Sequence, residues 1–103
     1  MNNDQRQAVW RESIEKYGKE TQSIVCMEEC AELIQAISKL LRGQDTPEHR
    51  DNLAEEMADV TICLRLLQIM WDVSGAEIDR WITTKTYRQS KRLDAAETKE
   101  TDE

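Results

Sequence analysis

The stretch TPEHRDNLAEEMADVTICLRLLQIMWDV, residues 46–73, decides the fold of this chain. Its apolar residues recur at steps of three and four, which places them along one face of a helix. The residues of this face are Leu53, Met57, Val60, Leu64, Leu67 and Trp71. Thr46 offers an N-cap hydroxyl, and Pro47 suits the first helical position. The pattern predicts one helix from Pro47 to about Val73, with a length of about 40 Å.

Three further helices are predicted on either side of this long helix. The first covers about residues 4–17 and ends at Gly18, because glycine readily takes the positive φ found just past a helix end. The second covers about residues 21–41, and the fourth starts at the capping-box sequence SGAE, residues 74–77, and reaches about Arg92. No stretch is typical of a strand. We therefore expect an all-α fold, a four-helix bundle with long central helices that oligomerisation completes.

The charge balance argues against nucleic acid as a partner. The chain has 21 acidic and 14 basic residues and a formal net charge of −7, so no large positive field is available to hold duplex phosphates.

No apolar run approaches the roughly 20 residues that a membrane span needs, and the N-terminal sequence MNNDQ lacks the features of a signal segment. The sequence predicts a cytoplasmic protein that binds neither nucleic acid nor membrane.

Chain length and the last residues predict the domain organisation. A chain of 103 residues suits one domain, which we place at residues 1–93. Residues 94–103, DAAETKETDE, have no large apolar side chains to bury and are predicted to form a disordered acidic tail.

The three cysteines, Cys26, Cys30 and Cys63, form no C-x-x-C motif and are expected to be reduced core residues.

Two groups of carboxylates border surface that should be buried. One group lies in the second helix and the other in the third: Glu28, Glu29 and Glu32, and Glu55, Glu56 and Asp59. Residues at i and i+3 project from the same helix face, so each group presents a pair of acids side by side. Two like charges about 5 Å apart repel by roughly 3 kcal/mol at an effective dielectric near 20. A divalent cation removes this conflict, and the acids therefore predict a magnesium site.

Two other interpretations of these acids remain open. The acids could be ordinary solvated residues that are neutralised by Lys39, Arg42 or Arg65. They could also belong to a carboxylate-bridged di-iron bundle, which uses a Glu-x-x-His pair on each of two helices. The chain has a single histidine, His49, near the start of the third helix, and no such pair. His49 is therefore expected to be a surface residue and not a ligand.

The acid motifs resemble a known family signature. EECAEL at residues 28–33, followed by EMAD at residues 56–59, resembles the E-E-x-x-E and E-x-x-D motifs of the all-alpha NTP pyrophosphohydrolases. Gly18 and Gln22 precede the first motif as in short relatives. KTYRQSKR at residues 85–92 resembles the K-x-x-x-N-x-x-R motif of their late helix, with Gln89 in the place of Asn. The chain resembles MazG-like members of phage or bacterial type.

The resemblance implies an enzyme that splits a nucleoside triphosphate into a monophosphate and pyrophosphate. It implies Mg²⁺ as the cofactor, with Mn²⁺ as a substitute. The implied metal ligands are Glu29, Glu32, Glu56 and Asp59. The implied catalytic acids, which would orient water or take its proton, are Glu28 and Glu55. The substrate-binding candidates are Lys85, Gln89 and Arg92 on one face of the fourth helix, Gln22, and Trp81 as a stacking surface one turn before Lys85.

The broad apolar face of the third helix also predicts self-association. A chain this short cannot cover such a face alone, so we expect a homodimer or a homotetramer with the nucleotide site near a subunit interface. Two functions without catalysis remain open. The chain could be a helical module that binds metal or nucleotide without turnover, or an interaction protein whose third helix binds a partner.

Overall fold

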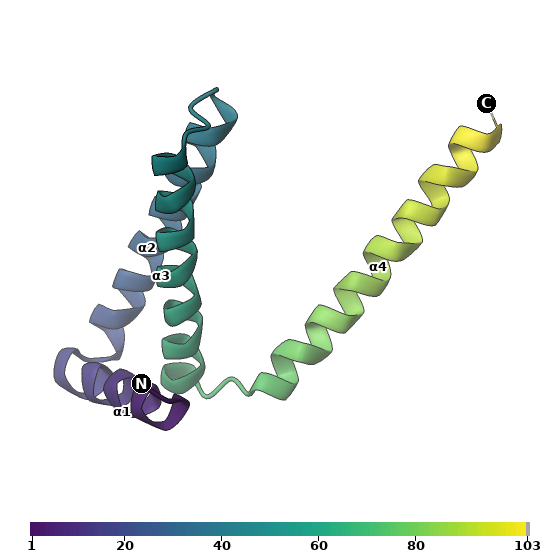
Figure 1. Cartoon of the computed structure of the whole chain (residues 1–103). Coiled ribbons are helices and arrows are strands. Elements are labelled where there is room, and N and C mark those ends of the chain that lie inside the picture. The colour runs from purple at the N-terminus through teal and green to yellow at the C-terminus, as the bar shows by residue number, and fades with distance from the viewer. Residues whose placement is uncertain (103) are drawn as a thin grey trace. The chain divides into compact units, whose positions relative to one another are not determined.

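The computed structural model describes the backbone of residues 1–102 and the side chains of residues 1–98, and all regular elements in this range are α-helices (Figure 1). The helices are α1 (Asn3–Tyr17), α2 (Lys19–Leu41), α3 (Pro47–Trp71) and α4 (Gly75–Asp102). The predicted all-α fold class is confirmed. Contacts divide the chain into two compact units, Met1–Asp72 with the first three helices and Val73–Glu103 with α4.

The helix ends follow from local hydrogen bonds. Asn2 forms a capping box with Gln5, in which each side-chain oxygen accepts the other residue's backbone N–H at 2.8 Å. Gly18, with φ of 91°, ends α1 as predicted and also opens α2. Thr46 Oγ1 accepts the His49 N–H at 3.2 Å, which confirms the predicted start of α3 at Pro47. These ends are set by neighbouring residues, which is why the sequence predicted them.

The α3 helix ends at Trp71, slightly before the expected Val73, and Asp72 is its C-cap. Asp72 adopts the left-handed conformation (φ 53°, ψ 49°), and its N–H donates to the Gln68 carbonyl. Two residues later, Ser74 Oγ accepts the Glu77 N–H at 3.1 Å and caps α4. A non-glycine residue therefore takes the strained position at the end of α3.

The core of the first unit lies where α1 crosses the paired helices α2 and α3 (Figure 1). Its buried residues are Cys26, Cys63 and Leu66, and Trp10, Ile14, Leu67 and Met70 pack against them. All three cysteines are free thiols, as predicted. Burial raises the pKa of Cys63 to about 12, so this thiol stays protonated and unreactive.

Cys30 is exposed, and its predicted place in the core is wrong. It lies one turn beyond Cys26 and about 40° further around the helix, which takes it off the buried stripe.

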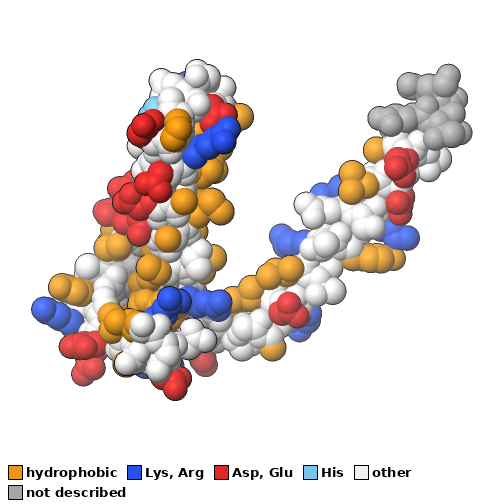
Figure 2. All heavy atoms as spheres, in the orientation of Figure 1, with side chains coloured by type: hydrophobic (Ala, Val, Ile, Leu, Met, Phe, Trp, Pro, Cys, Tyr) orange, Lys and Arg blue, Asp and Glu red, His pale blue; other side chains and the backbone are white. Residues whose placement is uncertain are grey.

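Large apolar side chains remain on the surface of α2 and α3 (Figure 2). They recur at every seventh position, as Met27, Ile34 and Leu41 on α2 and as Met57, Leu64 and Trp71 on α3. The second set belongs to the apolar face that the sequence predicts to be too wide for this chain alone to cover, and in the single chain these three residues are exposed. The face of α3 that packs against α2 carries Glu56, Cys63 and Leu66 instead. The apolar surface of α3 is too wide for one neighbouring helix to cover.

Helix α4 continues to Asp102, past the expected end at Arg92. Residues 94–102, predicted to be disordered, are helical because Ala95, Ala96 and Glu97 favour helix and no Gly or Pro interrupts them. The side chains of residues 94–98 are exposed. Glu103 and the side chains of residues 99–103, the rest of the predicted tail, lie outside the described residues. The division into a domain at 1–93 and a tail stays a prediction.

Three large apolar side chains of α4 are exposed: Ile78, Trp81 and Ile82. Their unit consists of this one helix, which offers no second surface to bury them.

Among the described helices, none combines the length and the apolar character needed to cross a membrane.

Candidate metal centre

The two acid motifs meet in the structure. Glu29, Glu32 and Glu56 each place one carboxylate oxygen within 4.8 Å of the others, and Glu55, Glu56 and Asp59 form a second group by the same measure. Glu56 belongs to both groups and joins the acids of α2 to those of α3. Figure 2 shows the acidic side chains gathered midway along the α2–α3 pair. The four residues that the sequence suggested as metal ligands thus lie in one cluster.

Two of these carboxylates are partly withdrawn from water. Glu56 is only 8% exposed and Glu29 is half-buried. Oε2 of each residue is buried and has no hydrogen-bond partner among the described residues. A buried carboxylate oxygen without a partner is unfavourable unless a proton or a cation satisfies it.

Burial and mutual repulsion change the protonation of both residues. Burial is the largest cause that raises the pKa of Glu29, and the charges of Glu32, Asp59 and Glu56 raise it further. Burial is also the largest cause that raises the pKa of Glu56, and the charges of the neighbouring carboxylates raise it further. The charged form of these carboxylates is therefore unfavourable in free energy, and a bound cation would stabilise it.

None of the basic side chains that the structure describes neutralises the cluster. Among the described side chains, no lysine or arginine forms an ion pair with the four acids. Arg42 donates to the Ser38 carbonyl at 3.4 Å, and Arg65 donates to Gln68 Oε1 at 3.1 Å. The interpretation in which Lys39, Arg42 or Arg65 neutralises the acids therefore lacks the contacts that it requires.

A histidine-containing metal site also lacks support. His49 Nδ1 lies 2.7 Å from the Gln44 carbonyl oxygen, and within the described residues neither acid group includes a histidine. The available donors are carboxylate oxygens, which are hard ligands of the kind that magnesium, manganese and calcium prefer. Two of these oxygens, one from each helix, are buried and unsatisfied. The residues present fit a divalent cation.

A match to a known family accounts for this arrangement. Residues 9–90 match the MazG nucleotide pyrophosphohydrolase domain. The chain belongs to the MazG family. The resemblance seen in the sequence is thereby confirmed, and the matched range contains both acid motifs. Searches of curated proteins and of solved structures found no match to this chain.

The two acids suggested as catalytic differ in their positions. In this MazG domain Glu55 is exposed and belongs to the acid group on α3. Glu28 is also exposed and belongs to neither group. Glu55 is therefore the better placed of the two to act beside the cluster.

Gln22 has a structural position that the sequence did not reveal. It is 7% exposed, and its Nε2 donates to Ser13 Oγ at 2.5 Å and to the Ser13 carbonyl at 3.4 Å. The side-chain amide joins α2 to α1 inside the unit. Its predicted contact with substrate has no support in this geometry.

The basic residues of the late helix share one face of α4, as their spacing predicted. Lys85, Gln89 and Arg92 line a shallow hollow of about 410 Å³ together with Ile82, Thr86 and Arg88. Trp81, half exposed, lies one turn earlier, and the Arg80 guanidinium carbon is 6.0 Å from its ring centroid. The MazG match ends at residue 90, before Arg92.

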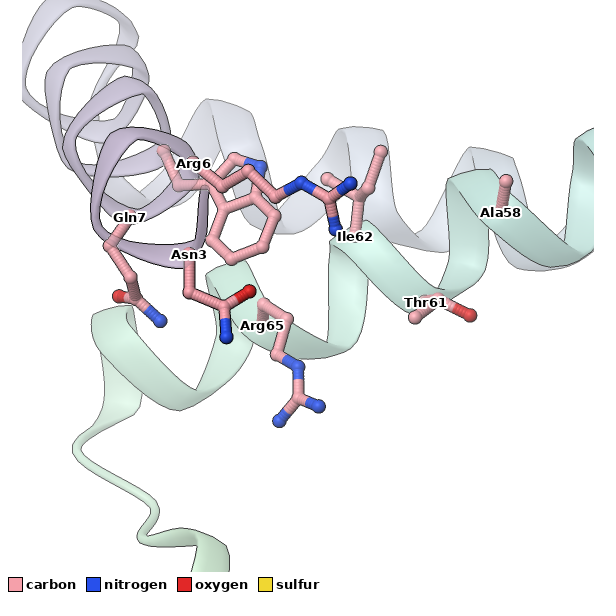
Figure 3. Close-up of a pocket in the computed structure, with 8 residues that line it drawn as sticks. Asn3, Arg6, Gln7, Ala58, Thr61, Ile62 and Arg65 are labelled. Carbon is pink, nitrogen blue, oxygen red and sulfur yellow. The ribbon is translucent and has the colours of Figure 1, made fainter. Parts of the chain in front are cut away.

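Sequence reasoning missed a cavity between α1 and α3 of the MazG domain (Figure 3). It lies at a crossing of two helices that are far apart in the sequence. No periodicity within either helix reports such a crossing, and the two arginines in its wall are the only signal in the sequence.

Proposed function

We propose that this MazG domain is a magnesium-dependent nucleoside triphosphate pyrophosphohydrolase. Water attacks the α-phosphorus, and the products are a nucleoside monophosphate and pyrophosphate. The observation that supports this proposal is the pair of buried carboxylate oxygens on Glu29 and Glu56. Among the described residues, these oxygens have no hydrogen-bond partner and no lysine or arginine forms an ion pair with their cluster. Membership of the MazG family supports a nucleotide as the substrate.

The proposed cation ligands are Glu29, Glu32, Glu56 and Asp59. Mg²⁺ suits them because it binds a few carboxylates and keeps its other positions for water and substrate phosphates, and Mn²⁺ accepts the same oxygen donors. When bound, the ion supplies positive charge that offsets the charge of the triphosphate as the bond to the leaving pyrophosphate breaks.

Proton transfer is assigned to a carboxylate that stays exposed. Glu55 lies within the acid group of α3 and is open to solvent, so its carboxylate can accept the proton of the attacking water. Glu28, exposed beside Glu29, is the second candidate. Neither residue has one of the buried oxygens that we assign to the cation.

Substrate contacts are assigned to α4. Lys85 and Arg92 carry positive charges suited to pyrophosphate oxygens, and Gln89 lies on the same face between them. Trp81 offers half of its surface as a platform on which a base can stack.

The proposed enzyme is a homodimer or a homotetramer. Met27, Ile34 and Leu41 on α2 and Met57, Leu64 and Trp71 on α3 leave two apolar faces exposed on a small protein. Contiguous apolar surface of this kind marks an interaction site, and a second copy of the chain carries the same surface to match it. The nucleotide site then lies near a subunit interface.

A pyrophosphate-release screen tests the catalytic proposal. Ribo- and deoxynucleoside triphosphates are incubated with the full chain in magnesium, in manganese and in chelator. We expect release with either metal and none in chelator. Glu56→Gln should lower the rate by about a hundredfold or more, because a ligand with a buried oxygen is lost. Glu15→Gln, an exposed acid of α1 outside both groups, is the matched control and should keep full activity.

Two results would overturn the catalytic proposal. One is equal release by wild type and Glu56→Gln. The other is cation binding without release from any triphosphate, which would favour the module that binds metal without turnover.

A further inference from the structure

The cavity between α1 and α3 has the size of a small-molecule site. Its volume is about 760 Å³, within the range of roughly 300–1,000 Å³ typical of ligand pockets. Figure 3 shows Asn3, Arg6 and Gln7 bordering it from α1, and Ile62 and Arg65 from α3. Trp10 completes the wall on the side of α1.

Two arginines from different helices meet at this cavity in a chain whose net charge is −7. Within the described side chains, neither Arg6 nor Arg65 forms an ion pair with an acid. Arg65 instead donates to the neutral Gln68 side chain, and the Arg6 side chain has no hydrogen bond among the described residues. A guanidinium group presents several N–H donors in a planar fork that matches phosphate oxygens. The pair therefore favours a phosphate-bearing anion.

The remaining groups suit a base. Trp10 is half-buried and packs against the core residues Cys26, Cys63 and Leu66, which holds its ring in place as a stacking surface. Asn3 and Gln7 lie one turn apart on α1, and both line the cavity. Side-chain amides supply both donors and acceptors, as the edge of a nucleobase requires.

Arg65 lies on the opposite side of α3 from Glu56, the residue that joins the two acid groups. Arg65 is nine positions after Glu56, which corresponds to about 180° around the helix. A ligand held by Arg65 therefore does not share a face with the proposed cation ligand Glu56, and its binding needs no metal.

We propose that this cavity binds a nucleoside monophosphate independently of the acid cluster. The base stacks on Trp10, Asn3 and Gln7 contact its edge, and the phosphate lies between Arg6 and Arg65. This site does not depend on the proposed hydrolysis, because none of the acids assigned to catalysis or to the cation lines it.

Calorimetric titration in excess chelator tests the site. The four common ribonucleoside monophosphates, the matching nucleosides and inorganic phosphate are each titrated into the full chain. We expect at least one monophosphate to bind, and its nucleoside and phosphate alone to bind about tenfold more weakly or worse, because each lacks half of the contacts. The double variant R6A/R65A should lose about tenfold or more in affinity for the monophosphate.

Matched variants separate this site from the acid cluster. R42A removes one positive charge at the exposed end of α2, outside the cavity, and should bind as wild type does. Glu56→Gln should also keep full affinity in chelator. Trp10→Phe, which preserves an aromatic ring in the core, should bind with an altered affinity, and circular dichroism should show that every variant keeps its helices.

Four results would overturn the proposal. They are no binding of any monophosphate at millimolar concentration, unchanged affinity in R6A/R65A, loss of binding in Glu56→Gln, and equal affinity for inorganic phosphate and the monophosphate. None of these results would affect the magnesium-dependent release of pyrophosphate, so the two proposals fail separately.

Discussion

Oε2 of Glu29 on α2 and Oε2 of Glu56 on α3 are both buried, and among the described residues both lack a hydrogen-bond partner. The two helices are packed together, so folding brings these two residues into one acid cluster that an unfolded chain does not form. Folding without a cation therefore includes an electrostatic cost. A ligand that removes this cost binds only the folded chain and stabilises it.

We predict that magnesium raises the thermal stability of the wild-type protein. At a cation concentration about 100 times the dissociation constant, the free energy of unfolding should increase by about 2.7 kcal/mol. Differential scanning calorimetry with and without chelator measures this difference. Glu15→Gln should respond as wild type does.

Glu56→Gln should lose this response, while its midpoint in chelator stays equal to that of wild type or rises. The amide keeps the shape of the side chain and removes one of the repelling charges. An undiminished magnesium effect in Glu56→Gln would exclude this residue as a ligand.

The raised pKa values of Glu29 and Glu56 predict a pH dependence of stability in chelator. Because these pKa values are raised in the folded chain, the folded state binds more protons than the unfolded state at pH values above the ordinary 4.5. The contribution of these residues to stability is therefore greatest near or below pH 4.5 and decreases as pH rises through their raised pKa values.

The unfolding midpoint of wild type minus that of a Glu29→Gln, Glu56→Gln double variant isolates this contribution. The difference should fall as pH rises from 4.5 toward neutrality in chelator, and saturating magnesium should abolish the fall, since the cation stabilises the charged carboxylates. A difference that grows with pH in chelator would contradict the assignment.

Local signals in the sequence were sufficient to predict most helix boundaries and the acid pairs. Thr46 and Gly18 act through bonds to residues within one turn, and the spacing of Glu29 to Glu32 places both on one helix face. The sequence also predicted one magnesium site formed by both acid motifs, and in the structure Glu56 joins the acids of α2 to those of α3.

Contacts between helices were beyond the reach of the sequence. The wide apolar surface of α3 allows several rotations against α2, and periodicity alone did not show that Leu66 would be buried while Leu64 stays exposed. The bond from Gln22 to Ser13 and the cavity beside Arg65 depend on how α1 crosses the other helices. Helix α4 ends at Asp102 and not, as the sequence predicts, at about Arg92. The acidic composition of the last residues predicts disorder, but the helix propensity of Ala95 and Ala96 has the larger effect.

Asp72→Gly should stabilise the first unit. Asp72 takes a left-handed conformation at the end of α3, which is less favourable for a residue with a Cβ than for glycine. We expect a gain of about 0.5 to 1 kcal/mol in the free energy of unfolding, measured by urea denaturation. Asp72→Val, with a β-branched side chain, should have the opposite effect. A loss of stability in the glycine variant would indicate that the Asp72 side chain has a role of its own.

The exposed apolar stripes predict that the protein associates with itself through α2 and α3. Ile34 and Leu64 are 67% and 54% exposed in the single chain, and burying a side chain of this size contributes about 1.5–3 kcal/mol. In a twofold-symmetric dimer each substitution acts twice, so Ile34→Glu or Leu64→Glu should weaken association by roughly a hundredfold or more.

Sedimentation velocity at micromolar concentration should show a dimer or tetramer for wild type and monomer for both variants. Val9→Glu, at an exposed position of α1 away from the stripes, is the matched control and should remain associated. A monomeric wild type would leave both stripes in water and would contradict the assembly, whereas intact association of both glutamate variants would move the interface to another face of the protein.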